Sequence, residues 1–141
     1  MNVQLITLSG VEYSADAHSV QLPTAAGIIT VMAKHEPLMS VLVPGVITIK
    51  RQAGDPEHAL EHYATFGGVV EVKRDTVKVL VDDADDASEI NEKEAERARE
   101  AAERLLKDAK DQVEINQAQA IIARQGVRLQ VAQLKRRQTR R

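Results

Sequence analysis

The chain has 141 residues, no cysteine and a formal net charge of −2, and 43% of its residues are hydrophobic. This length suits one ordinary domain or a small domain with an appendage, and the apolar content suffices for a globular core. The lack of cysteine excludes disulfides, thiolate metal sites and cysteine nucleophiles. The N-terminus lacks the basic start and long apolar run of a signal peptide, and uncharged stretches fall short of the ~20 apolar residues of a membrane span. We therefore expect a soluble chain that is at most peripheral to a membrane.

The composition changes sharply near residue 87. Residues 1–86 carry 6 Lys and Arg against 12 Asp and Glu, a net charge of −6, whereas residues 87–141 carry 13 against 9, a net charge of +4. All four prolines and six of the seven glycines lie in the first part. This change predicts a domain over residues 1–87 and a second unit over residues 88–141, joined by the acidic segment "DDADDASE" at 82–89.

The first part has the pattern of a β domain. Short runs rich in Val, Ile and Thr, such as "VQLITL", "GIITVM" and "TVKVLV", are separated by Gly, Pro and Asp turn signals. In "VVEVKRDTVKVLV" at 69–81, valines alternate with charged residues on both sides of Arg74 and Asp75, which predicts a hairpin with one buried face. So many short strands would leave a single sheet with an apolar face in water, so we expect two small packed sheets.

The second part predicts a helical hairpin. Asp86 with Glu89 three residues later is typical of a helix start, with Ser88 as a competing N-cap, and Asp111 with Glu114 indicates a second start. Between these starts runs a thin, mostly alanine stripe: Ala95, Ala98, Ala102, Leu105 and Ala109. Alanines bury little area, so we expect the hairpin to be held weakly and to be able to detach.

Residues 117–141 are strongly basic. They contain seven Lys and Arg and no acidic residue. A run of charge is often only a solvated face, but one-sided charge over this length favours an anionic partner.

The pair His35 and Glu36 raises the question of an enzyme site. A zinc helix of the H-E-x-x-H kind fails here, because position 39 is Met and Pro37 would disrupt the helix. The sequence has no G-x-S-x-G elbow and no Gly-rich phosphate loop. The remaining histidines show no ligand-like grouping except His58 and His62, which in a strand would not share a helical face. We therefore predict neither a catalytic nor a metal site. Gly67 and Gly68 instead indicate close backbone approach within a strand.

Three segments in this order resemble the epsilon subunit of the bacterial and chloroplast rotary (F-type) ATP synthase. They are "LPTAAGIITVMAKHEPLMSVLVPGVITI", "FGGVVEVKRDTVKVLVDDAD" and the charged helical end "ARQGVRLQVAQLKRR". The most specific parts are His35, Pro37 and Leu38, the following Pro44 and Gly45, and the G-G-x-x-E-V motif that begins at Gly67. The resemblance covers essentially the whole chain.

The resemblance implies a flattened β-sandwich of about ten short strands followed by a two-helix hairpin, in a non-catalytic subunit of the central stalk. It implies a β domain that binds the gamma subunit and the c-ring, with His35, Pro37 and Leu38 near these contacts. For His35, satisfying the local backbone is the alternative role. The chain would be associated with the membrane only through the complex, peripherally on the cytoplasmic face of a bacterial plasma membrane, or on a plastid thylakoid.

In this family the helices either fold against the sandwich or extend into the catalytic head, where the second helix meets an acidic segment of the β subunits and blocks ATP hydrolysis. The residues that the resemblance implies for this inhibitory contact are Arg124, Arg128, Lys135, Arg136 and Arg137.

Some members of this family bind ATP through a motif written I/L-D-x-x-R-A, which falls on residues 90–95. Here Asn91 and Glu94 replace both polar anchors, whereas Ile90 is kept and Arg124 and Arg128 match the arginines that complete the site. A glutamate facing a triphosphate is repulsive, so we expect no cofactor and at best weak ATP binding. The sequence also departs from the family near the c-ring contacts, with Ala26, Ile28, Thr30 and Ala33.

A different class of function is a β domain with a basic helical arm that binds nucleic acid. The seven cations of residues 117–141 allow it, since phosphate neutralisation needs little beyond Lys and Arg. The acidic β domain and the 2% aromatic content, which offers few stacking platforms, oppose it.

Overall fold

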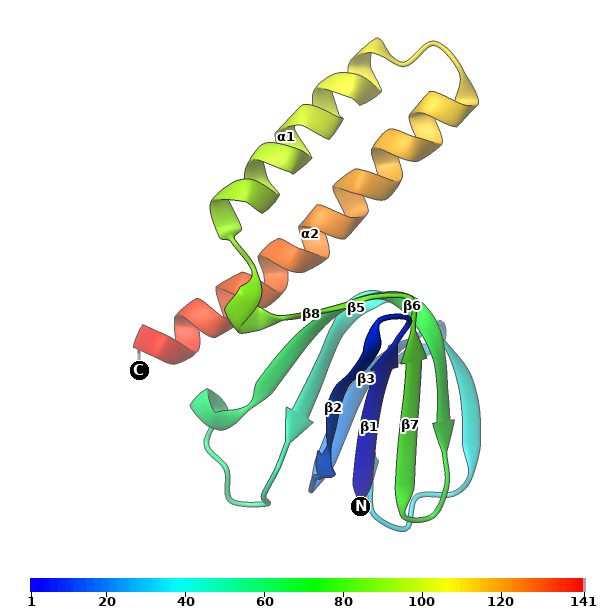
Figure 1. Cartoon of the computed structure of the whole chain (residues 1–141), viewed down its shortest axis with the longest axis vertical. Helices are drawn as coiled ribbons and strands as arrows, with labels where there is room; N and C mark the ends of the chain where they lie inside the picture. The colour runs from blue at the N-terminus through cyan, green and yellow to red at the C-terminus, as the bar shows by residue number, and fades with distance from the viewer. Residues whose placement is uncertain (141) are drawn as a thin grey trace.

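The computed structural model describes residues 1–140 as eight strands followed by two helices (Figure 1). The strands are β1 Asn2–Thr7, β2 Gly10–Asp16, β3 Ser19–Thr24, β4 Gly27–Met32, β5 Leu38–Lys50, β6 Glu61–Val72, β7 Thr76–Val81 and β8 Ala84–Asp86. The helices are α1 Glu92–Asp108 and α2 Gln112–Arg140, and two 3-10 turns lie at η1 Glu57–Ala59 and η2 Ala87–Glu89. The predicted β domain followed by a helical hairpin is confirmed.

The strands form one continuous sheet in the order β2-β1-β7-β6-β5-β3-β4, with β8 beside β6. The C-terminal half of β6 pairs with β7, whereas its N-terminal half pairs with β8. The long strands β5 and β6 pair with each other along their length and therefore belong to both halves of the sheet, one with β1, β2 and β7 and the other with β3, β4 and β8. Buried residues of both halves form one core cluster, as expected of a sandwich. The structure has eight strands rather than about ten because β5 passes unbroken through Pro44 and Gly45, and β6 through Gly67 and Gly68.

The predicted hairpin is formed by the end of β6 and β7. Val72 lies opposite Val77, the turn contains Arg74 and Asp75, and the alternating valines of both strands face the core. The prediction for this segment is confirmed.

The predicted start of the second helix is confirmed, whereas the predicted start of the first is wrong. Asp111 caps α2 as predicted: the Glu114 amide donates to its carboxylate at 2.8 Å, and the Glu114 carboxylate accepts from the Lys110 amide at 2.9 Å. The first start was predicted wrongly, because Asp86 caps only the short turn η2, and α1 begins at Glu92 with Asn91 as its N-cap. Asn91 Oδ1 accepts from the backbone amides of Lys93 and Glu94, so the N-cap of α1 lies five residues later than Asp86.

The apolar stripe of α1 is shorter than predicted. Ala95 and Ala102 are buried, but Leu105 is 60% exposed and Leu106 is the partly buried leucine of this turn. Helix α2 lies between α1 and the sandwich, and the connection between the helices is the part of the hairpin farthest from the sheet (Figure 1). No helix within residues 1–140 is long and apolar enough to cross a membrane.

Candidate functional site

Helix α2 packs on the outer face of β5 and β6. Ala64, Ala87 and Val131 form a small buried cluster there, which is separate from the main core. Partly buried Val46, Phe66, Ile90 and Val127 surround it. The cluster contains only one fully buried large side chain, Val131, so its apolar area supplies modest docking energy.

Three ion pairs join the basic helix to carboxylates of the acidic segment 82–89 and of the first residue of α1. Arg124 pairs with Asp83 at 2.5 Å, Arg128 with Asp85 at 3.0 Å, and Arg136 with Glu92 at 3.2 Å. The Arg124 guanidinium also lies 4.1 Å from the centre of the Phe66 ring, within the range of a cation–π contact. The basic helix therefore has an anionic partner within its own chain. All three pairs are partly exposed to solvent, so each contributes little alone.

The last turns of α2 are held by a buried polar cluster. Gln138 Nε2 lies 2.8 Å from the Glu57 carbonyl oxygen, 3.2 Å from that of Leu60 and 2.8 Å from His62 Nε2. The opposite ring nitrogen, His62 Nδ1, lies 3.0 Å from Thr48 Oγ1. The amide nitrogen can only donate, so His62 Nε2 accepts, and the neutral ring carries its proton on Nδ1 and donates to Thr48.

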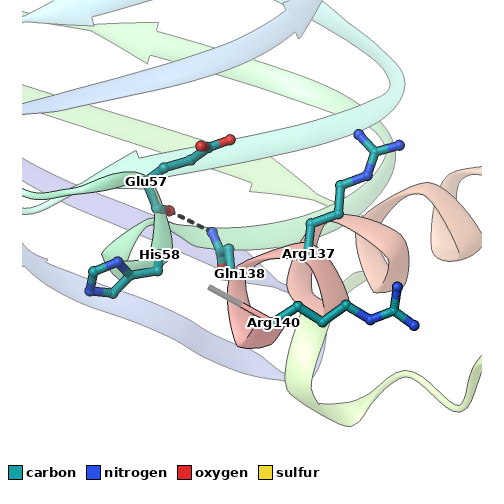
Figure 2. Close-up of a pocket in the computed structure, with 5 residues that line it drawn as sticks. All are labelled: Glu57, His58, Arg137, Gln138 and Arg140. Carbon is teal, nitrogen blue, oxygen red and sulfur yellow. Dashed lines mark hydrogen bonds between the residues drawn. The ribbon is translucent and has the colours of Figure 1, made fainter.

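The environment of His62 disfavours its charged form. Burial lowers the pKa of this imidazole first, Lys135 lowers it further, and Glu57 opposes both effects. Arg137 and Arg140 line a neighbouring cavity of about 240 Å³ together with Glu57, His58 and Gln138 (Figure 2).

A second surface lies on the outer face of the sandwich half that contains β1 and β7. Five strands contribute one apolar residue each to a continuous cross-strand row, which we call the outer row: Val41, Val69, Leu80, Ile6 and Val11. Val11 and Val41 are 62% and 60% exposed. Apolar residues that are direct cross-strand neighbours over five strands form a patch rather than scattered surface residues, and such patches mark contact surfaces.

The predicted rotor-docking residues lie in and beside the loop between β4 and β5. The Lys34 amide donates to the Arg74 carbonyl at 2.8 Å, which joins this loop to the β6–β7 turn. Pro37 and Leu38 line a shallow hollow together with Met39. His35 Nδ1 lies 2.7 Å from the Glu36 carbonyl oxygen, so the alternative role of satisfying the backbone is present.

The residues of the degenerate nucleotide motif have other contacts. Asn91 caps α1, Ile90 packs beside the small cluster under α2, and Glu94 is exposed. Arg124 and Arg128 are held by their carboxylate partners. Within residues 1–140, no group of three or more His, Asp or Glu is placed to hold a metal ion.

Sequence reasoning missed the cluster of Thr48, His62 and Gln138. A signal was present in "HYAT" at 62–65, where polar and apolar residues do not alternate. All four residues are buried, because the core covers one face of β6 here and α2 covers the other. A strand without alternation indicates burial on both faces.

Comparison with known proteins defines the class of this chain. The family model described as ATP synthase, Delta/Epsilon chain, beta-sandwich domain, matches residues 1–87. An ATP synthase epsilon chain of Herpetosiphon aurantiacus is 34% identical over 137 residues, covering 96% of each chain. That of Chloroflexus aggregans is 36% identical over 142 residues, covering 99% of each. The chain belongs to the ATP synthase epsilon-chain family.

Two solved structures share the fold. A chain of the Euglena gracilis mitochondrial ATP synthase OSCP/F1/c-ring superposes with a TM-score of 0.75 at 20% identity, covering 86% of this chain and 74% of that one. A chain of the Tetrahymena thermophila mitochondrial ATP synthase central stalk/c-ring gives a TM-score of 0.66 at 18% identity, covering 94% and 96%. At these identities the likeness shows the fold.

Proposed function

We propose that this chain is the epsilon subunit of the central stalk of an F-type ATP synthase. In this role its β-sandwich binds the gamma subunit and the c-ring, its helical hairpin regulates ATP hydrolysis, and the chain carries no catalytic group of its own. It would lie at the membrane only through the complex, on the cytoplasmic face in a bacterium. Family membership supports this role, whereas it lends nothing to the nucleic-acid alternative.

The outer row is the observation that carries the stalk-binding part of the proposal. It is apolar, it spans five strands, and α2 packs on β5 and β6 at a different position, beside Val46 and Ala64. A rigid sheet face of this kind suits a permanent contact between subunits, since little conformational freedom is lost on binding. The loop that holds Pro37 and leads into β5 at Leu38 is joined to the turn between β6 and β7, so it is the proposed edge of the same contact.

Charge substitution in the outer row tests stalk binding. Val41 and Leu80 are 60% and 47% exposed, so Val41→Lys with Leu80→Lys leaves the fold intact. We expect the double variant to lose at least about tenfold in affinity for the gamma subunit, because buried charges without partners oppose association. Val113→Lys, at an apolar position of α2 that is 63% exposed, is the matched control and should bind as the wild type does. Equal binding by all three proteins would refute the assignment of this surface.

The regulatory part of the proposal rests on the weakly held α2. Three of the five residues predicted for the inhibitory contact are engaged by Asp83, Asp85 and Glu92 in the docked conformation, while Lys135 and Arg137 are exposed. The same arginines would exchange this acidic segment for an acidic segment of the catalytic head when the hairpin extends. An exchange between two anionic partners needs only a small energy difference, which suits a two-state switch.

A further inference from the structure

We propose that His62 and Gln138 form a proton-sensitive latch that holds the end of α2 against the sandwich and releases it when the imidazole gains a second proton. The latch rests on the proposed function only for its consequence in the complex. The docking itself is a property of the isolated chain.

The geometry makes the docked state specific for neutral His62. Its Nδ1–H donates to Thr48 Oγ1, and its Nε2 accepts from Gln138 Nε2 at 2.8 Å. Protonation would place an N–H group on Nε2, directly opposite the amide hydrogens of Gln138. Two donors facing each other at this distance have no acceptor between them, so the contact becomes repulsive.

Gln138 does not have an equally good alternative position. Its Nε2, which has two hydrogens to share among three acceptors, also lies within hydrogen-bonding distance of the carbonyl oxygens of Glu57 and Leu60, and Figure 2 shows the contact with Glu57. Turning the amide to offer its oxygen to a protonated His62 would bring that oxygen against these two carbonyl oxygens, which are also acceptors. A protonated His62 therefore needs the amide oxygen of Gln138, whereas the carbonyl oxygens of Glu57 and Leu60 need its amide nitrogen. Withdrawal of Gln138 with the last turns of α2 removes this conflict.

The charges around His62 strengthen this dependence. Lys135 on α2 repels an imidazolium, and Arg137 and Arg140 of the same helix line the adjoining cavity. On the sandwich side, Glu57 of η1 acts in the opposite direction, His58 lines the same cavity, and the partner on β5 is the uncharged Thr48. Release of α2 separates His62 from Lys135 and returns the ring to water.

The direction of the effect follows from linkage. The docked state lowers the pKa of His62, so docking is fully favoured above the ordinary histidine value of about 6.5 and weakens as the pH falls below it. Between the undocked and docked pKa values, the ratio of released to docked chains rises by up to about tenfold per pH unit. In the complex, acidification would thus supply more extended hairpin and lower ATP hydrolysis.

Distance measurements on the full chain test the latch. The sequence contains no cysteine, so Gln52→Cys and Gln133→Cys place two spin labels, on an exposed loop of the sandwich and on α2, without background. From pH 8 to pH 5.5 we expect a longer-distance population to grow below about pH 6.5, in a window where carboxylates ordinarily stay charged. An unchanged distance distribution over this range would overturn the proposal.

Two variants separate the latch from other titrating groups. His62→Leu with Thr48→Val removes the polar pair and leaves Gln138 its two carbonyl acceptors, so α2 should stay docked at every pH. His58→Gln changes a histidine of the neighbouring cavity and should keep the pH dependence of the wild type. A pH response that survives in the His62 variant, or vanishes in the His58 variant, would assign the release to another group.

A second measurement does not depend on the folding of the His62 variant. Gln138→Ala removes the donor that faces Nε2, so the pKa of His62, followed by NMR in the full chain, should rise toward its ordinary value. An unchanged pKa would contradict the latch. Loss of regulation in the complex with a normal latch in the isolated chain would instead contradict the proposed function.

Discussion

At the scale of single residues, Gly68 is the position where the fold is least tolerant. Its φ is +153°, and a Cβ built there would lie 2.2 Å from the Leu80 carbonyl oxygen and 2.8 Å from Val81 Cγ1. The contact is with the backbone of the adjacent strand β7, which cannot move aside without breaking the ladder. Close approach of two strands, and not only turn formation, therefore requires this glycine.

Gly68→Ala should destabilise the chain more than Gly10→Ala. Gly10 also has a positive φ, of +137°, but a Cβ there meets nothing within 4 Å, so its substitution carries only the backbone cost of about 1–3 kcal/mol. At Gly68 the steric conflict adds on the order of 1–3 kcal/mol. Urea unfolding of the two variants measures the difference directly, and equal destabilisation would show that the backbone cost alone matters.

Single residues also show where sequence reasoning succeeds and where it stops. The close approach at Gly68 was predictable because the G-G pair interrupts a run with the strand pattern, whereas a Cβ at Gly67 would meet only the Leu42 carbonyl oxygen, at an ordinary 3.6 Å. The pairing of His62 with Gln138 was not, since 76 residues separate them and only the docking of α2 brings them together. A buried histidine in a strand gives no indication of which distant amide will face it.

The residues at the start of α1 lead to a prediction about ATP. Asn91 Oδ1 is occupied by two backbone amides, Glu94 is exposed, and Arg124 and Arg128 are ion-paired. ATP would have to break two ion pairs and meet a glutamate, and one like-charge contact at 4 Å costs on the order of 4 kcal/mol at an effective dielectric of about 20, before screening. Isothermal titration of the wild type should therefore show a dissociation constant of about 1 mM or weaker.

Restoring the motif tests this prediction in the opposite direction. Asn91→Asp keeps a capping oxygen, and Glu94→Arg exchanges an anion for a cation at an exposed position. The double variant should bind ATP at least about tenfold more tightly than the wild type. Submillimolar affinity of the wild type, or no gain in the double variant, would show that charge does not set the affinity.

At the scale of elements, the hairpin is held by a small apolar area together with exposed charge pairs, and neither is strong. The buried residues of α1 are Ala95 and Ala102, and the only fully buried large side chain of α2 is Val131. Three ion pairs and the Gln138 contacts supply the rest. The sequence predicted this weak alanine-rich interface and its basic helix, but not the partner, because net charge does not show which carboxylates lie close. The sequence also predicted a buried Leu105, although Leu105 is 60% exposed and Leu106 is the partly buried leucine of this turn.

Opposite changes in ATP hydrolysis should follow from neutralising the two sides of these ion pairs. Asp83→Asn, Asp85→Asn and Glu92→Gln remove the docked partners but leave the basic residues for the catalytic head, so hydrolysis by the assembled complex should fall. Replacing Arg124, Arg128, Lys135, Arg136 and Arg137 by Ala removes both contacts and should raise hydrolysis. Each exposed pair contributes only ~0.2–1 kcal/mol, so the effects should be cumulative and salt-sensitive. Changes in the same direction in both variants would refute the exchange of partners.

At the scale of the whole molecule, the two parts differ in what stabilises them. Every residue of the main core cluster lies between Val3 and Ala84, so the sandwich has a complete core without the hairpin. The hairpin has no comparable core, because most of its buried side chains are alanine or glutamine. The change of composition near residue 87 predicts a domain boundary at the same place.

Residues 1–87 alone should therefore fold and bind the gamma subunit. Truncation removes Val131 from the cluster with Ala64 and Ala87, and a buried valine contributes about 1.5–3 kcal/mol, so the free energy of unfolding should fall by no more than roughly this amount. The outer row, the loop of Pro37 and the start of β5 at Leu38 remain, so affinity for gamma should match that of the full chain.

Residues 88–141 alone should be largely unfolded, because isolated helices without a packed apolar face are marginal in water. Circular dichroism, urea unfolding and a gamma binding assay on both fragments measure these outcomes. A fragment 1–87 that folds but does not bind gamma would place the stalk contact on the hairpin, and one that does not fold would show that α2 completes the sandwich.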